Sequence, residues 1–314
     1  MLEDEDFGSM FGALCQNSGI QALDLSHLYN QGPTLSRQLL LPLLASCTLK
    51  KFVFPERMCL DSTVLGALKV NSSIREVTFN MVQFDATAIS EVLKVNKSLK
   101  KLEILRCSGS YVSIFESLVS NDSLLELIID NSPGSSFYEF TYREVEALKK
   151  MLQQNTTLLV LTLDGALISS IDLEFVLKGL EKNSVLKQVR FPGLNVSCLI
   201  LLFKALSANK LKMTFTVSPH FIDIETGVFR FSPVISTGIT DEDLVSLHYL
   251  SSSVKEFSLK GCTFSDEAYT CLLSFIRNST SLTSVDFSGS VLSDDQTSSF
   301  SSVLNSLSIS NFTK

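Results

Sequence analysis

The stretch LKVNSSIREVTF at residues 68–79 recurs, with small changes, as LKVNKSLKKLEI at residues 93–104. The two copies start 25 residues apart. A fixed interval of this size is typical of proteins built from stacked repeats. In the second half of each copy the first, fourth and sixth residues are apolar, and the first of them serves as the anchor of a repeat.

Anchors of this kind occur along the whole chain. They are Ile20, Leu49, Ile74, Leu99, Leu124, Leu158, Leu186, Leu211, Val254, Leu282 and Leu307. Seven of the ten intervals between anchors span 25 to 28 residues, and the intervals of 34 and 43 residues correspond to the same unit with an insertion. Asparagine stands three or four residues before most anchors. The spacing therefore predicts about ten copies of one structural unit.

Each unit changes its period part of the way along. SLKKLEI at residues 98–104 alternates with a period of two, as a short strand does. TYREVEALKKMLQQN at residues 141–155 has helical spacing, and Thr141 with Glu144 forms a helix-start signal. We interpret the asparagine at each helix end as a residue that ends the helix by entering the left-handed backbone region. The predicted unit is strand, turn, helix and tight return.

One such unit cannot bury its own apolar side, so neighbouring copies must stack on one another. We expect an α/β fold, a right-handed solenoid with parallel strands inside a curved arc and helices outside. Residues 1–314 are predicted to form a single solenoid with insertions at about 131–140 and 218–235. The first unit has a helix without its strand, and the last unit lacks a polar cap. We therefore expect either that the chain is a piece of a longer protein or that its ends are capped irregularly.

The pattern L-x-x-N-x-S-L-x-x-L-x-L followed by a helix resembles the long, ribonuclease-inhibitor-like class of leucine-rich repeats. Cys107 and Cys262 each follow the last strand residue by three positions, where this class often has Cys or Asn. Most other units have a different residue there, so the match is loose. The sequence is most similar to intracellular members, which include actin regulators of the tropomodulin and CARMIL type and the sensor regions of innate immune receptors. The residues do not separate these groups.

Composition excludes several function classes. The chain has 314 residues, 45% of them hydrophobic, with 33 acidic and 26 basic side chains and a net charge of −7. This balance argues against a nucleic-acid binder, which normally has a basic excess. No apolar run approaches the roughly 20 residues of a membrane span, and no signal peptide is present. Seven cysteines without a CxxC pair are typical of reduced thiols, so we expect a cytoplasmic protein.

Seven N-x-S/T sequons occur, and five of them fall at one corresponding place in successive repeats. We interpret them as by-products of the repeat rather than as glycosylation sites.

The sequence has no recognisable catalytic motif. There is no P-loop, HExxH, GxSxG or metal-spaced cluster, and His27, His220 and His248 are far apart in the chain. We therefore predict no enzymatic activity, no metal, no cofactor and no small-molecule substrate.

The strand residues between the buried ones are expected to point into the concave side and to contact a protein partner. The candidates are Asp24, Val53, Thr78, Glu103, Ile128, Thr162 and Arg190. Their charges are mixed, so the face is not built for a strongly charged polymer. The alternative interpretation is an ordinary solvated strand surface.

The two insertions supply further candidates. The first contains Phe137, Tyr138 and Phe140, and the second is predicted to be a hairpin that contains Phe221, Phe229 and Phe231. If Ile224 pairs with Val228 around a three-residue loop closed by Gly227, these three phenylalanines share a face. Both insertions are expected to emerge from one edge of the arc, because each follows a strand and precedes a helix. Protruding aromatic side chains are frequent interface anchors. The alternative is that they fold back and cover their own core.

The leading functional hypothesis is a non-enzymatic module that binds a protein partner through its concave face and one loop edge, as a scaffold does. One alternative is an actin-cytoskeleton regulator of the tropomodulin or CARMIL type. Another is a GTPase-activating repeat protein similar to RanGAP. That activity needs an exposed Arg or Asn where a strand passes into a helix, and Arg106 and Asn80 are the candidates.

Overall fold

The computed structural model describes residues 12–14, 16–17, 19–27, 40–45, 48–60, 62–107, 109–131, 138–191, 196–208, 211, 213–217, 220–223, 228–231, 249, 254–259, 261, 263–307, 309 and 311–313. The chain divides into two compact units. Unit 1 comprises residues 1–166 and 178–186, and unit 2 comprises residues 167–177 and 187–314. That residues 1–314 form one solenoid stays a prediction.

Unit 1 contains a parallel sheet whose strand order follows the chain. Its strands are β1 (Ala22–Asp24), β2 (Lys51–Val53), β4 (Glu76–Asn80), β6 (Lys101–Leu105), β7 (Glu126–Asp130) and β9 (Val160–Asp164). Each strand pairs in parallel with the next one of this series. The predicted stacking of strand on strand is therefore confirmed for this unit.

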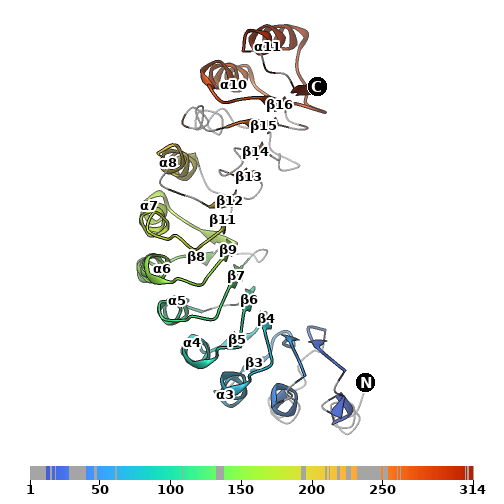
Figure 1. Cartoon of the computed structure of the whole chain (residues 1–314), viewed down its shortest axis with the longest axis vertical. Coiled ribbons are helices and arrows are strands. Elements are labelled where there is room, and N and C mark those ends of the chain that lie inside the picture. The colour runs from blue at the N-terminus through green and yellow to red at the C-terminus, as the bar shows by residue number, and fades with distance from the viewer. Residues whose placement is uncertain are drawn as a thin grey trace. The chain divides into compact units, whose positions relative to one another are not determined.

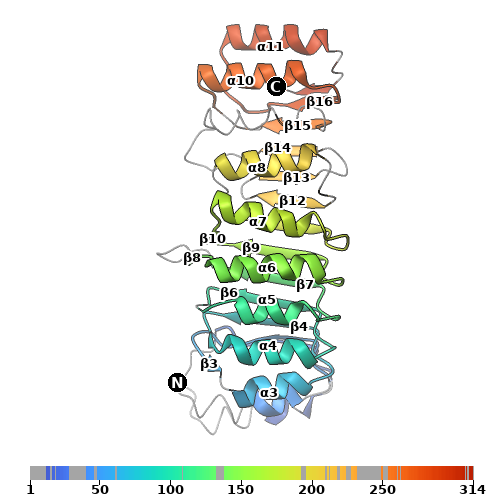
Figure 2. The same cartoon turned by 90° about the vertical axis from the view of Figure 1, so that its left-hand side faces the viewer.

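The helices of unit 1 lie on one side of this sheet (Figure 1). They include α3 (Ser62–Val70), α4 (Ala86–Val95), α5 (Val112–Leu118) and α6 (Tyr142–Gln154). Each helix packs against the next in chain order (Figure 2). The short strands β3 (Cys59–Leu60), β5 (Gln83–Phe84) and β8 (Tyr138–Glu139) lie in the connections from strand to helix.

The core of unit 1 lies between the sheet and the helices. On β6, Leu102 and Ile104 are at most 1% exposed, whereas Glu103 between them is half-buried. On α4 the buried side chains include Ile89, Val92 and Leu93, which follow helical spacing. Alternation with a period of two on the strand and of 3.6 on the helix therefore directs both apolar sides into one layer.

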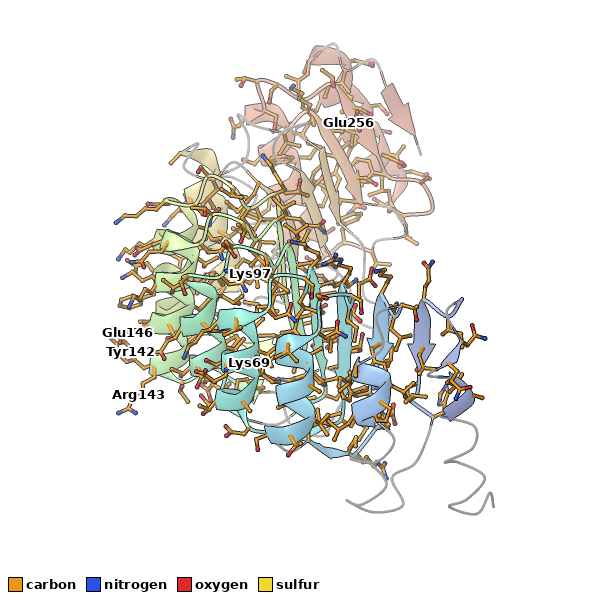
Figure 3. All side chains as sticks on the ribbon, turned by 60° about the horizontal axis from the view of Figure 1, so that its bottom comes forward. Lys69, Lys97, Tyr142, Arg143, Glu146 and Glu256 are labelled. Carbon is orange, nitrogen blue, oxygen red and sulfur yellow. The ribbon has the colours of Figure 1, made fainter. Side chains whose placement is uncertain are left out.

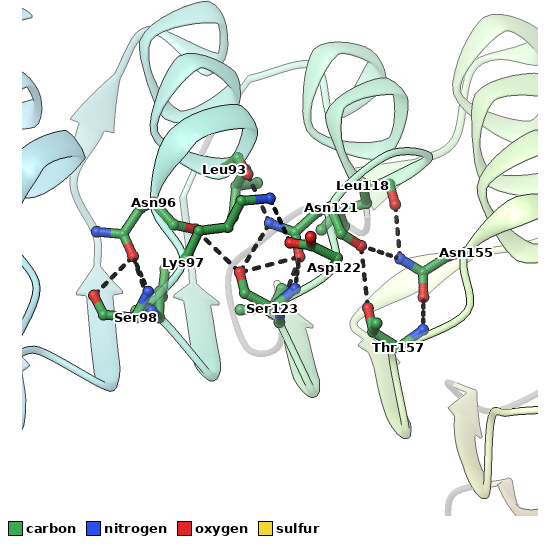
Figure 4. A network of polar contacts seen from close by, with 12 residues as sticks. Leu93, Asn96, Lys97, Ser98, Leu118, Asn121, Asp122, Ser123, Asn155 and Thr157 are labelled. Carbon is green, nitrogen blue, oxygen red and sulfur yellow. Dashed lines mark hydrogen bonds and ion pairs between the residues drawn. The ribbon is translucent and has the colours of Figure 1, made fainter.

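Asparagine side chains join successive coils of unit 1. The Oδ1 atom of Asn96 accepts hydrogen bonds from the backbone N–H groups of Ser98 and Leu99, each at 2.8 Å. Its Nδ2 group donates to the main-chain oxygens of Leu68 and Asn71 in the preceding coil, also at 2.8 Å. Asn71 and Asn183 make corresponding bonds to the coil before them, as do Asn121 and Asn155 (Figure 4).

The predicted left-handed conformation of these asparagines is wrong at the two helix ends where the backbone angles are known. Asn96 has φ −70° and ψ 123°, and Asn155 has φ −71° and ψ 132°, both in the extended region. The asparagine ends the helix through its side chain, which forms hydrogen bonds with backbone groups of the turn and of the previous helix end. Because Asn96, Asn121 and Asn155 are at most 4% exposed, the folded chain does not present these three sequons for glycosylation.

Unit 2 also contains strands in chain order. They are β11 (Gln188–Phe191), β12 (Thr214–Val217), β13 (His220–Asp223), β14 (Val228–Phe231), β15 (Glu256–Leu259), β16 (Ser284–Asp286) and β17 (Asn311–Thr313). Its helices include α8 (Val196–Ser207), α10 (Asp266–Asn278) and α11 (Asp294–Ser306). The chain passes between the two units three times: within β10 (Ala166–Leu167), within α7 (Ser170–Leu180), and between residues 186 and 187, just before β11.

The predicted hairpin exists, but it lies within the sheet rather than protruding from its edge. β13 pairs antiparallel with both β12 and β14, and β14 pairs in parallel with β15. A hairpin adds two strands and therefore restores the direction of the chain, so the parallel series resumes at β15. The expectation that both insertions emerge from one edge is corrected here.

The register of the hairpin also differs from the prediction by one residue. Asp223 is opposite Val228, Ile222 is opposite Phe229 and Phe221 is opposite Arg230. Residues directly opposite one another share a face, and a shift of one residue exchanges the faces. Phe221 is therefore out of register with Phe229 and Phe231, and the predicted shared face of the three is wrong.

Helix starts agree with the sequence where they are described. Thr141 and Glu144 form a capping box at α6, and Ser293 and Gln296 form one at α11. Among the described residues, no helix is long and apolar enough to cross a membrane.

Candidate functional site

The open strand face of unit 1 is the side of its sheet opposite the helices, and it contains the predicted partner-binding row. Of that row, Asp24 is exposed and Glu103, Ile128 and Thr162 are half-buried. Arg190 is exposed on β11 of unit 2. Half-exposed side chains on a hydrogen-bonded sheet are held at fixed spacing, which is the geometry a binding surface requires.

Two members of the predicted row are covered rather than exposed. Thr78 is 6% exposed, because its hydroxyl donates a 2.6 Å hydrogen bond to Glu103 and lies beneath that side chain. Val53, opposite Thr78 in the sheet register, is 8% exposed. The expectation that Val53 and Thr78 offer contact area is corrected. Both residues are buried within the face and present little surface to a partner.

Charges alternate along the column next to this row. Lys51, Glu76, Lys101 and Glu126 are successive partners in the register. The Lys101 ammonium lies 3.1 Å from carboxylate oxygens of both Glu103 and Glu126. Burial opposes the charge on Lys101, but the hydrogen bonds that its ammonium donates to the two carboxylates, together with their negative charges, outweigh burial and raise the pKa of Lys101. The column is thus neutralised within the fold.

Apolar side chains form a diagonal across the open strand face. Leu105, Ile128 and Val160 are half-buried and lie on the three adjacent strands β6, β7 and β9. Ile128 is in the central row, whereas Leu105 is opposite Asp130 at the end of β6 and Val160 is opposite Glu126 at the start of β9. Because the neighbouring charges are largely engaged with one another, this apolar diagonal is the part of the face that would gain most from contact with a partner.

A cluster of polar side chains lies at the carboxyl ends of β4 and β6. Arg106 donates to Oδ1 of Asn80 through Nε at 3.0 Å and Nη2 at 2.8 Å, and Nη2 lies 3.3 Å from Oε1 of Glu56. The Asn80 amide also donates to Glu56 at 2.5 Å. Arg106, the candidate for a GTPase-activating side chain, is therefore engaged by a carboxylate and an amide of its own chain.

The turns that follow the strands require a left-handed backbone. Gly165, Gly261 and Gly289 have φ between +65° and +72° there. Arg57, Met81 and Arg106 adopt φ between +52° and +57°, a region that disfavours residues with a Cβ atom. The sequence gives no local sign of this strain, because none of the three is a glycine or an asparagine.

The described end of the first insertion, residues 138–140, packs onto the core of unit 1. Phe140 is 5% exposed, and its ring centroid lies 6.5, 6.3 and 5.6 Å from those of Tyr111, Phe115 and Tyr138. Phe140 is thus a core residue, which corrects its prediction as an interface anchor. Tyr138 is half-buried, and Phe137 lies outside the described residues.

A buried carboxylate holds this insertion in place. Glu144 on α6 is 0% exposed and accepts hydrogen bonds from the Tyr111 backbone at 2.7 Å, from the Thr141 backbone at 2.9 Å and from the Tyr138 hydroxyl. Burial raises the pKa of Glu144, but these hydrogen bonds together outweigh burial and lower it. The sequence analysis recognised Glu144 only as part of a helix cap, since Tyr111 is 33 residues away in the chain.

The hairpin candidates Phe221, Phe229 and Phe231 lie on β13 and β14. The structure describes the backbone of these three residues but not their side chains.

Cys107 and Cys198 are not activated nucleophiles. Burial raises the pKa of Cys107 and of Cys198 to about 11 in each case. Among the described residues, no group of three or more His, Cys, Asp or Glu side chains is placed to hold a metal ion.

The stacked strand-and-helix coils and their open strand face have the α/β solenoid fold that the leucine-rich repeat pattern predicts. No protein-family model matches the chain, and no curated protein does either. Among solved structures, the chain is similar to one in the TLR13–ssRNA13 complex, with 13% identity and a TM-score of 0.46, covering 93% of this chain and 37% of that one. It is also similar to the leiomodin-1 actin-binding site 2 structure, with 16% identity and a TM-score of 0.34, covering 58% of this chain and 92% of that one. Neither similarity assigns a function to this chain.

Proposed function

We propose that the chain is a non-enzymatic module of the long, ribonuclease-inhibitor-like repeat class that binds a protein partner through the open strand face of unit 1. The observation that carries the proposal is the apolar diagonal formed by Leu105, Ile128 and Val160 beside the paired charges of Lys101. Apolar contact area bordered by polar side chains is usual in a protein interface.

The electrostatics of the face favour a protein over a polyanion. Lys51 and Lys101 are the basic side chains of the charge column, and both are paired with glutamates. A nucleic-acid surface needs a basic excess that can replace counterions. A partner that presents apolar side chains and a few charges of both signs matches the face better.

Substitution at the centre of the face tests the proposal. In Ile128→Lys the new ammonium lies opposite Glu103 in the register, and an opposite-charge pair across strands is compatible with the sheet. The matched control is Ile171→Lys, which replaces a 69% exposed isoleucine on α7. We expect affinity capture from cytosol to lose its protein partner with Ile128→Lys and to keep it with Ile171→Lys. Equal capture by both variants would reject the strand face as the binding surface.

A further inference from the structure

A second surface of unit 1 lies at the edge where helices end and strands begin. Six large apolar side chains are exposed among the described residues, and three of them lie at this edge in consecutive coils. Val70 and Val95, the last residues of α3 and α4, are 80% and 49% exposed, and Leu125, just before β7, is 39% exposed. Their grouping separates this edge from singly scattered apolar residues, which are normal on protein surfaces.

The same edge is basic. It carries Lys50, Lys69, Arg75, Lys94, Lys97 and Lys100, and its acidic residues are Glu91, Glu116 and Asp122. Six positive and three negative side chains give +3 at this edge, in a chain whose net charge is −7. The adjacent column of Lys51, Glu76, Lys101 and Glu126 adds two charges of each sign and does not alter the balance. We call these six basic and three apolar residues the basic edge.

Backbone hydrogen bonds fix the spacing of its central residues. The Arg75 N–H donates to the Lys50 oxygen at 2.7 Å, and the Lys100 N–H donates to the Arg75 oxygen at 2.7 Å. The Leu125 N–H continues the column to the Lys100 oxygen at 2.8 Å. Three cationic residues and one leucine therefore occupy successive steps of one ladder, at roughly the 4.8 Å separation of neighbouring strands. A partner would meet a surface whose backbone is already ordered, which lowers the entropy cost of binding.

The helix dipole accounts for only part of this composition. Lys69 and Lys94 stand in the last turns of α3 and α4, where a positive charge is favourable. The dipole gives no reason for exposed Val70, Val95 and Leu125. A surface that combines exposed apolar side chains with an excess of one charge is better explained by a partner of opposite charge.

We propose that the basic edge binds an acidic segment of a protein that also carries apolar side chains. A protein segment fits better than an anionic bilayer because carboxylates stand among the cations. Glu91 lies between Lys69 at 3.5 Å and Lys94 at 2.8 Å, and Asp122 pairs with Lys97. A peptide can place its acidic groups between these carboxylates, whereas a uniformly anionic plane would meet them directly.

Two charge-matched variants of the full chain test the proposal. Lys50→Glu/Lys100→Glu changes the basic edge, and Arg143→Glu/Lys150→Glu makes the same change of −4 in net charge on exposed positions of α6. Figure 3 shows Arg143 pointing outward from that helix. The probe is a displayed library of random peptides selected against the wild-type chain. We expect enriched peptides to combine Asp or Glu with apolar residues. Their binding should weaken at least about tenfold in the edge variant and change little in the control, with loss at high salt.

The other outcomes overturn the proposal. Enriched peptides that are basic, or that bind both variants equally, would show that the edge is not the site. A failure to enrich any peptide would do the same, as would binding of the wild-type chain to phosphatidylserine vesicles but not to acidic peptides. If the edge variant fails to fold, Val70→Ser/Val95→Ser replaces it, because both valines are exposed. Ile128→Lys, on the other surface, is expected to leave peptide binding unchanged, so the two sites are tested separately.

Discussion

The Nδ2 group of Asn96 lies 2.8 Å from the main-chain oxygen of Asn71, so the helix end of one coil is bonded to the helix end of the coil before it. Asn155 repeats the relationship with the oxygen of Asn121 at 3.2 Å. These side chains satisfy backbone groups that a helix end otherwise leaves without partners. The recurrent asparagine is therefore a connection between coils as well as a helix stop.

Asn121→Ala is expected to destabilise the chain by about 2–3 kcal/mol, because buried backbone donors and an acceptor lose their partner. Asn121 is 4% exposed and bonds Ser123, Leu124 and Leu93. Urea unfolding followed by circular dichroism measures the change. Asn278→Ala is the control, since Asn278 is exposed at the end of α10. Equal effects of the two substitutions would refute the role of the buried asparagine.

Phe140→Ala should cost about 3–5 kcal/mol, the usual range for a buried phenylalanine. Its ring fills the space between Tyr111, Phe115 and Tyr138. Tyr142→Ala, two residues further on, is expected to change stability by less than about 0.5 kcal/mol because that side chain is 59% exposed. Thermal unfolding measures the loss of stability in each of the two variants. A Phe140→Ala protein that melts like the wild type would return Phe140 to the interface candidates.

Glu144→Gln is expected to reduce stability at pH 7 and to lose its effect in acid. The pKa of Glu144 lies below its ordinary value of 4.5 in the folded chain. A lowered folded-state pKa contributes stability above the unfolded pKa, and this contribution is lost as the pH falls through the folded-state pKa. The difference in unfolding free energy between wild type and Glu144→Gln should therefore be constant from pH 7 to 5 and shrink below 4.5. A difference that grows on acidification would contradict the ionised state of Glu144.

Arg57→Gly should make the chain more stable than Arg57→Ala, by about 0.5–1 kcal/mol, because only glycine avoids the left-handed Cβ penalty. Arg57 is exposed and has φ +57°. Both variants remove the same side-chain contacts, so their difference isolates the backbone. Denaturant midpoints that coincide would show that this turn carries no strain.

The repeat period was enough to predict the strand-and-helix coils, because apolar spacing directly reports which side of each element is buried. It was not enough to predict how Asn96 ends its helix. A left-handed cap and a side-chain cap need the same residue type, and the acceptor at Asn71 becomes apparent only when coils stack.

The two insertions likewise could be predicted from the sequence only in part. The sequence predicted the hairpin at residues 220–231, but its place between β12 and β15 depends on strands outside the insertion. Deletion of residues 218–235 would consequently remove two strands of the sheet and would not test binding alone. Phe140 likewise became a core residue through ring contacts with Tyr111 and Phe115, which no local pattern indicated.

The central claim is that unit 1 binds a protein through its open strand face, and hydroxyl-radical labelling of side chains in the captured complex tests it most directly. Hydrogen exchange is less suited, because the strand backbones are already hydrogen-bonded. The account predicts that Leu105, Ile128 and Val160 become protected on binding while exposed Ile171 does not change. Unchanged labelling of Leu105, Ile128 and Val160 in a complex of confirmed stoichiometry would contradict it.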